Sequence, residues 1–77
     1  MLLEIITPDQ KLFEGEVTSV TVPGTSGVFQ MLNRHAPVIS ALKKGKIKIK
    51  STDGTQQFDV NGGVAEKRKN KIIVLAE

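Results

Sequence analysis

Regular alternation of apolar and polar residues is the strongest pattern along this chain. In the segment GKIKIK, Ile47 and Ile49 alternate with lysines. A period of two places the isoleucines on one face of a strand and the lysines on the other, and helical spacing cannot produce it. Val20 and Val22 alternate with polar residues in the same way, as do Phe58 and Val60. Residues 17–22 are rich in β-branched residues, but Val17 is out of phase with Val20 and indicates a bulge between them. The pattern therefore predicts several half-buried β-strands.

The last apolar run, residues 72–76, departs from this alternation. Its sequence, IIVLA, is apolar at every position. A strand of this kind is expected to be covered on both faces. We therefore predict either an interior strand or a strand docked against another element.

Turn residues separate the apolar runs at short intervals. Asp53-Gly54 is the clearest hairpin turn, because both residues tolerate the positive φ that a tight turn between twisted strands requires. Asn61-Gly62-Gly63 has two interpretations, a hairpin turn or a strand position that another backbone approaches closely. Many short strands with this spacing predict an all-β fold, a flattened β-sandwich or barrel.

Length and composition limit the architecture further. A chain of 77 residues is expected to form one domain, residues 1–77, with a thin hydrophobic core. There is no cysteine, and therefore no disulfide framework or thiolate metal site. The N-terminus lacks a basic start and a cleavage pattern, and no run of about 18 apolar residues occurs. We expect neither export nor direct membrane insertion.

Basic residues give the chain a formal net charge of +3 and gather in residues 43–50 and 67–71. The first cluster is interpreted as the outward face of a strand, where lysine discourages edge-to-edge pairing, and the second as a hairpin turn. A small RNA-binding β-barrel is the alternative function. Such a barrel needs aromatic side chains on which bases stack, and this chain has three phenylalanines, no tyrosine and no tryptophan. Solvated faces are therefore favoured, and no nucleic-acid partner is expected.

No set of residues indicates catalysis or cofactor binding. His35 is the single histidine, and no serine has a spacing that pairs it with His35 as a nucleophile. One histidine with scattered carboxylates matches no metal-ligand pattern. The glycine-rich segment PGTSG at 23–27 lacks the lysine and the following helix of a nucleotide-binding loop. We expect no catalytic residue, no cofactor and no metal.

Two long segments resemble one known family. They are LEIITPDQKLFEGEVTSVTVPGTSGVFQMLNRHAPVISALKKGKIKI and NGGVAEKRKNKIIVLAE, which together cover nearly the whole chain in order. The most specific part is PGTSGVFQML followed by HAPVISAL, a paired glycine and a final strand ending in VLAE. The chain resembles the N-terminal β-sandwich domain of the epsilon subunit of F-type ATP synthase, called delta in mitochondria.

The resemblance implies a fold, a function and partners. It implies two roughly five-stranded sheets and a noncatalytic rotor subunit of the central stalk that binds the gamma subunit, and through gamma the catalytic alpha/beta head. Contact with the c-ring would couple proton translocation to ATP synthesis. The implied location is peripheral, on the cytoplasmic face of the bacterial inner membrane. The expected fold has no C-terminal helical hairpin, so neither inhibition nor ATP binding is assigned to these residues.

The resemblance also implies interface positions. The loops around the glycine-rich turn and the HAP segment are expected to face gamma and the c-ring. The corresponding residues here are Val28, Gln30, Asn33, Arg34, His35 and Ser40. Relatives commonly have Pro-Gly at positions 33–34 and an acidic residue at position 28, so this loop is more polar and one charge contact is missing. Pro37 favours extended backbone at Ala36, which gives His35 a role in shape and contact rather than catalysis.

Overall fold

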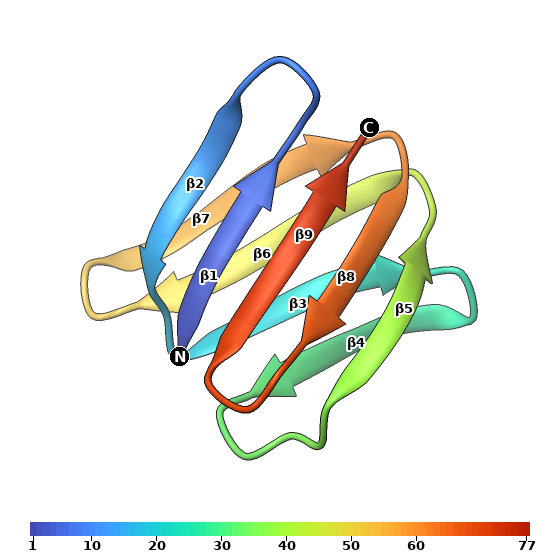
Figure 1. Ribbon diagram of the computed structural model, residues 1–77. Coiled ribbons are helices and arrows are strands. Elements are labelled where there is room, and N and C mark those ends of the chain that lie inside the picture. Colours follow the sequence, from blue (N-terminus) through green and yellow to red (C-terminus); the bar gives the residue numbers. More distant parts are fainter.

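The computed structural model describes all residues, 1–77, and consists of nine β-strands joined by short turns (Figure 1). The strands are β1 (Leu2–Ile6), β2 (Lys11–Glu16), β3 (Ser19–Gly24), β4 (Gly27–Leu32), β5 (Val38–Leu42), β6 (Gly45–Ser51), β7 (Gly54–Val60), β8 (Gly63–Lys67) and β9 (Lys71–Ala76). The all-β architecture is confirmed. The structure contains no helix with the length and hydrophobicity needed to span a bilayer.

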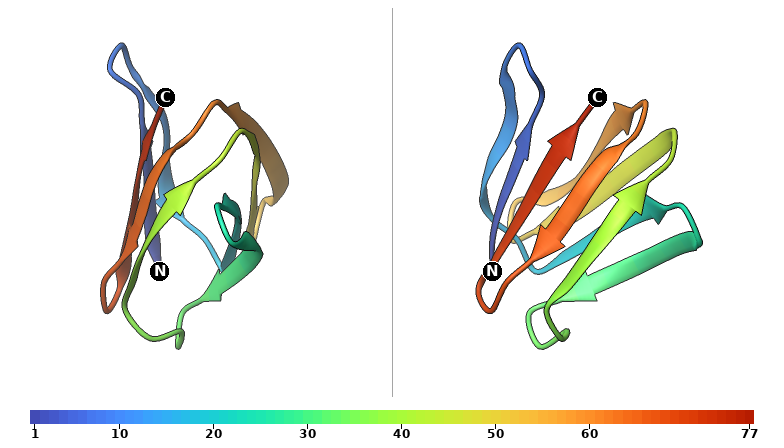
Figure 2. Two further views of the ribbon diagram at one scale, coloured as in Figure 1. Left: turned by 90° about the vertical axis from the view of Figure 1, so that its right-hand side faces the viewer. Right: turned by 45° about the vertical axis from the view of Figure 1, so that its right-hand side comes forward.

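The strands form two layers that lie face to face (Figure 2). The first layer has the strand order β2-β1-β9-β8-β5, and the second has the order β4-β3-β6-β7. Strands β1 and β9 run parallel, whereas the other neighbouring strands are antiparallel. One pairing, Gly24 of β3 with Leu42 of β5, joins the layers at one edge. The predicted flattened sandwich is confirmed, with five strands in one layer and four in the other.

The core lies between the inner faces of the two layers. Strand β6 shows how the sequence builds it: Ile47 and Ile49 are buried, and the lysines between them are exposed, as the alternation predicted. The other core residues are supplied in the same way by the inner faces of their strands or, for Val17, by the link before β3. They are Leu3, Ile5, Val17, Val20, Val22, Met31, Leu42, Val60, Ala65, Ile72, Val74 and Ala76.

The three phenylalanines border this core. Phe13 of β2 and Phe58 of β7 meet edge to face across the layers, with ring centroids 5.9 Å apart. Phe29 of β4 is also partly buried and packs against the core. All three rings therefore contribute to packing, and none stands on an open sheet face as a platform for base stacking.

The β6–β7 hairpin lies where the sequence predicted it, displaced by one residue. Ser51 pairs with Gly54, so Thr52 and Asp53 form the two-residue loop. Gly54 has a φ of 123°, and no residue other than glycine has a positive φ. The special backbone conformation therefore falls on Gly54 alone, at the first position of β7.

The segment Asn61-Gly62-Gly63 carries the chain from the second layer to the first. Strand β7 pairs with β6, whereas β8 pairs with β5 and β9, so this segment is no hairpin turn. Gly63 has a φ of 138°, and a Cβ at this position would overlap the carbonyl oxygen of Leu75. The interpretation of close backbone approach is confirmed.

Candidate interaction surface

The outer face of the first layer carries a row of apolar side chains, which we call the apolar row. Ile6 pairs with Leu75, Leu75 with Val64, and Val64 with Ala41, so the row crosses β1, β9, β8 and β5. Val64 is 42% exposed and Leu75 is 56% exposed. A hollow of about 420 Å³ opens at Ile6, Val64 and Leu75. Contiguous exposed apolar side chains of this kind are typical of a surface that contacts another macromolecule.

Strand β9 therefore differs from its prediction in one respect. It is an interior strand between β1 and β8, as expected. The prediction that it is covered on both faces is wrong, because Leu75 faces outward on the uncovered side of the layer. Both faces of β9 are apolar, but only the inner face, with Ile72, Val74 and Ala76, is covered by the rest of the chain.

A second row beside the apolar row mixes apolar and acidic side chains. Glu4, Ile73, Glu66 and Ile39 are paired in register across the same four strands. Ile39 is 71% exposed. Both glutamates are in ion pairs: Lys71 Nζ lies 2.7 Å from a Glu4 oxygen, and Arg68 Nε lies 3.3 Å from a Glu66 oxygen. The apolar row is thus bordered by charges that are already paired, the arrangement of an interface with an apolar centre and a polar rim.

Glu4 is the most strongly constrained of these charges. Lys71 and Lys11 both donate to its carboxylate, and these hydrogen bonds lower the pKa of Glu4. Lys11 also lies 3.0 Å from Glu14, and its hydrogen bonds to Glu14 and Glu4 raise the pKa of Lys11. Glu4 and Glu14 stand directly opposite each other on β1 and β2, so Lys11 between them offsets the repulsion of two like charges.

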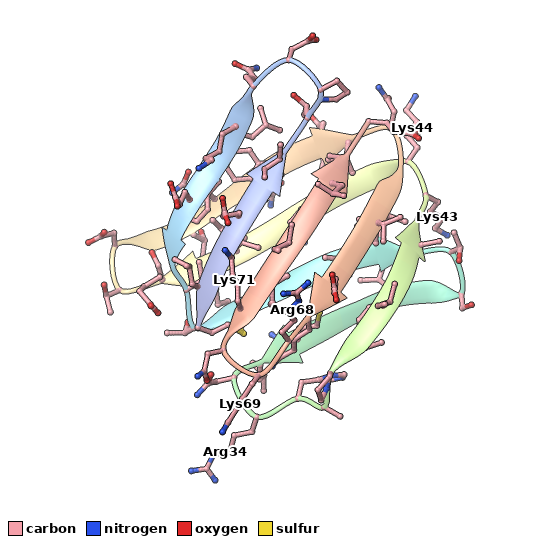
Figure 3. All side chains as sticks on the ribbon, in the orientation of Figure 1. Arg34, Lys43, Lys44, Arg68, Lys69 and Lys71 are labelled. Atoms are coloured by element: carbon pink, nitrogen blue, oxygen red, sulfur yellow. The ribbon has the colours of Figure 1, made fainter.

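The β4–β5 loop lies at one end of this surface. Asn33, Arg34 and His35 are all exposed there, and the His35 amide donates to the Leu32 carbonyl oxygen at 2.9 Å. Arg34 and Lys69 project from the same end of the sandwich (Figure 3). His35 Nδ1 lies 2.8 Å from the Ala36 carbonyl oxygen, close enough for a protonated Nδ1 to donate. This contact leaves the Nε2 side of the ring available to a partner.

Lys67 holds this loop in place. Its side chain is 1% exposed, and its ammonium group donates to the carbonyl oxygens of Arg68 at 3.0 Å, Asn33 at 3.4 Å and Lys69 at 3.4 Å. Three ammonium protons thus meet three backbone acceptors from two loops, which offsets the cost of burying a charge. The prediction that this lysine cluster is a solvated turn is wrong for Lys67, because β8 turns its last side chain inward.

The structure groups some of the interface candidates and separates others. Asn33, Arg34 and His35 share the β4–β5 loop. Val28 and Gln30 are exposed on the outer face of β4, in the second layer. Ser40 alternates with Ile39 and Ala41 on β5, so it points to the inner side of the first layer and is half-buried. These six residues therefore do not form one flat surface.

Sequence reasoning missed the apolar row. In VISAL both sets of alternating positions are mostly apolar, and this was the available signal that β5 has two apolar faces. The row itself combines residues from four strands, and no single segment specifies the registers between them.

The structure also contains no candidate metal site. No three histidine, cysteine, aspartate or glutamate side chains gather in an arrangement suited to a metal ion.

Fold and surface together define a two-layer β-sandwich domain with an apolar outer face suited to protein contact. The family model for the β-sandwich domain of the ATP synthase delta/epsilon chain matches residues 1–77. The chain therefore belongs to the ATP synthase delta/epsilon family.

Two relatives illustrate the match. The ATP synthase epsilon chain of Chlorobium limicola is 45% identical over 76 residues, which cover 97% of this chain and 86% of the relative. The epsilon chain of Maridesulfovibrio salexigens is 43% identical over 77 residues, which cover 100% of this chain and 54% of the relative. The chain thus spans most of the first relative and about half of the second.

Solved structures share the fold at lower sequence identity. A chain in the cryo-EM structure of the Euglena gracilis mitochondrial ATP synthase, OSCP/F1/c-ring, matches with a TM-score of 0.88 and 19% identity, covering 96% of this chain and 48% of that one. A chain of the Tetrahymena thermophila mitochondrial ATP synthase central stalk/c-ring matches with a TM-score of 0.80 and 17% identity, covering 97% and 61%. At this identity the likeness establishes the sandwich fold.

Proposed function

We propose that this chain is a noncatalytic rotor subunit of an F-type ATP synthase. It binds the gamma subunit in the central stalk, contacts the c-ring, and reaches the catalytic alpha/beta head through gamma. In this role it helps couple proton translocation to rotary ATP synthesis, as a peripheral component at the cytoplasmic face of the bacterial inner membrane. Family membership supports the proposal, together with solved neighbours described as F1/c-ring and central stalk/c-ring assemblies.

The apolar row is the observation that carries the proposal. Val64 and Leu75 lie at its centre with about half of each side chain exposed. A partner that covers them removes apolar surface from water without breaking any hydrogen bond of the sheet, because the strand backbones are already paired. Ion pairs at the border need no new partner. The row is therefore the proposed centre of the gamma contact.

The β4–β5 loop extends this contact at its polar end. Asn33, Arg34 and His35 are exposed beside a hollow of about 490 Å³ that Ile39 and Lys67 help to line. Val28 and Gln30 on β4 are the proposed candidates for the c-ring side, and Ser40 on β5 is the sixth proposed interface residue. Because Lys67 fixes the Asn33 carbonyl, this loop presents one shape to its partner and has less entropy to lose on binding.

The test is a binding titration against the cognate gamma subunit. The variant V64T/L75T places a β-branched threonine in each strand but removes apolar area at the centre of the row. We expect it to weaken gamma binding by about 2 kcal/mol, or roughly thirtyfold. Isothermal titration calorimetry at two salt concentrations measures this, and wild-type affinity is expected to change little with salt because the centre is apolar.

A matched control variant is K46T/D59T. It also places two threonines on outward strand positions, removes an ion pair of the second layer, and leaves the net charge unchanged. We expect normal gamma affinity for it. Single-stranded RNA serves as the second ligand: RNA binding that falls steeply with salt, with no gamma complex, would establish the nucleic-acid alternative instead. If V64T/L75T and wild type bind gamma with equal affinity, the apolar row is not part of the gamma contact.

A further inference from the structure

The outer face of the second layer is hollowed, and polar side chains line the hollow. The cavity has a volume of about 370 Å³ and lies over β3, β6 and β7. Thr21 and Ser19 of β3 pair with Lys48 and Lys50 of β6, and Lys50 pairs in turn with Thr55 of β7. Side chains directly opposite on one face of a sheet are close neighbours, so two lysines and three hydroxyl-bearing residues line the cavity together.

Lys48 and Lys50 have no acidic partner. The next lysine on the same face, Lys46, is paired with Asp59 at 3.0 Å, but neither Lys48 nor Lys50 takes part in an ion pair. No aspartate or glutamate lines the cavity. Two residues along a strand correspond to about 6.8 Å, so these like charges repel each other. An anion between them would convert the repulsion into two attractions.

Ser19 lines the cavity together with the two lysines. The residue is 6% exposed, and its hydroxyl makes no hydrogen bond within the protein while it retains access to the cavity. No buried side-chain oxygen or nitrogen lacks a hydrogen-bond partner, so this hydroxyl is open to the cavity and to solvent. Ser19 and the two unpaired lysines line the same cavity, where the Ser19 hydroxyl can donate to a bound acceptor.

From this arrangement we infer that the cavity binds a phosphate or diphosphate group. The oxygen atoms of a phosphate accept hydrogen bonds. The cavity offers donors of three kinds: two lysine ammonium groups, hydroxyl groups and the carboxamide of Gln57. Hydrogen bonds of about 2.8 Å from both ammonium groups can end on oxygens of one tetrahedral anion. The volume is several times the roughly 30 Å³ share of one water molecule, so a diphosphate also has room.

The experiment is an amide NMR titration of the 77-residue chain with inorganic phosphate and, separately, with pyrophosphate. We expect saturable shifts confined to residues 19–21, 48–50 and 55–57, with a dissociation constant of about 1 mM or lower for pyrophosphate. Tighter binding of pyrophosphate than of phosphate identifies a diphosphate-bearing ligand, whereas equal affinities identify a single phosphate. Sodium chloride at matched ionic strength should leave these amides unshifted.

Two variants and a control test the site. K48Q/K50Q removes both charges and should weaken pyrophosphate binding at least tenfold, and S19A should weaken it several-fold with both lysines present. K43Q/K44Q removes the same charge from the β5–β6 turn, away from the cavity (Figure 3), and should bind normally. Thermal melts show that each variant is folded.

Three results would overturn the inference. They are shifts spread over all the lysine-rich segments, equal weakening by K43Q/K44Q and K48Q/K50Q, and unchanged binding in S19A. The last of these would reduce the cavity to a patch of surface charge. Gamma binding is measured on the opposite layer with different variants, so failure here leaves the proposed rotor function standing.

Discussion

The outer face of the first layer around β8 and β9 and that of the second layer along β6 differ in chemistry, although the two layers share one core. The first layer presents Val64 and Leu75 to solvent, whereas the second presents Lys48 and Lys50. Every second side chain of a strand points away from the core, so its residue type depends on whether the outer face contacts solvent or a partner. An exposed lysine is well solvated, whereas burying an exposed apolar side chain against a partner lowers the free energy. The comparison identifies the first layer as the side suited to a protein partner.

The largest expected effect concerns backbone packing in the first layer. Gly63→Ala forces a side chain into the space of the Leu75 carbonyl oxygen at a φ of 138°, so β8 and β9 cannot keep their pairing. We expect a loss of about 3 kcal/mol or more in the free energy of unfolding. Urea denaturation followed by far-UV circular dichroism measures it, since the chain has no tryptophan or tyrosine for fluorescence.

Gly54→Ala is the matched control in the second layer. Gly54 has a similar φ of 123°, but a Cβ there meets no atom within 4 Å. Its expected loss is about 1 kcal/mol, from backbone strain alone. Equal losses at the two glycines would show that the Leu75 carbonyl does not restrict position 63.

The next effect separates a buried lysine from an exposed one. Lys67→Met keeps an unbranched apolar stem but leaves the carbonyl oxygens of Asn33, Arg68 and Lys69 without their donor. We expect the free energy of unfolding to fall by about 2 kcal/mol. Hydrogen exchange at the His35 amide should accelerate, because the loop loses its contact to β8.

Lys50→Met provides the comparison, since Lys50 is exposed on the outer face of the second layer. It should change stability by no more than about 0.5 kcal/mol. Should Lys67→Met be equally mild, with unchanged exchange at His35, the three carbonyl contacts would have no part in holding the loop.

The smallest effect depends on pH and concerns the charged border of the apolar row. Ion pairing lowers the pKa of Glu4, so its contribution to stability is fully present above the pKa of the unfolded state, about 4.3. The contribution disappears as the pH falls through the lower folded-state pKa. Wild type should therefore be more stable than Glu4→Gln at neutral pH, and the difference should shrink in acid. Thermal melts from pH 7 to pH 2 measure it.

Asp9→Asn is the control for this pH series, because Asp9 is exposed and takes part in no ion pair. Its melting temperature should follow that of wild type throughout. A constant difference between wild type and Glu4→Gln over the whole range would show that the carboxylate charge of Glu4 does not stabilise the fold.

Local patterns were sufficient for much of the fold. Alternation assigned Ile47 and Ile49 to the core, and turn chemistry located the β6–β7 hairpin to within one residue. Both signals depend on neighbours in the sequence, since side-chain direction along a strand and the φ of a glycine are properties of a few residues. The all-β class followed from these signals, whereas the two separate sheets were implied by the family resemblance.

The burial of Lys67 and the composition of the outer surfaces depended on the register between strands that are distant in the sequence. Lys67 is adjacent to three other basic residues in the sequence, yet its burial depends on the carbonyl of Asn33, which lies 34 positions away. The apolar row joins Ile6 to Leu75 and Val64 to Ala41, and these pairs meet only because β9 lies between β1 and β8. Single segments therefore specified the strands and their inner faces, whereas the registers between distant strands assembled the outer surfaces on which contact with a partner depends.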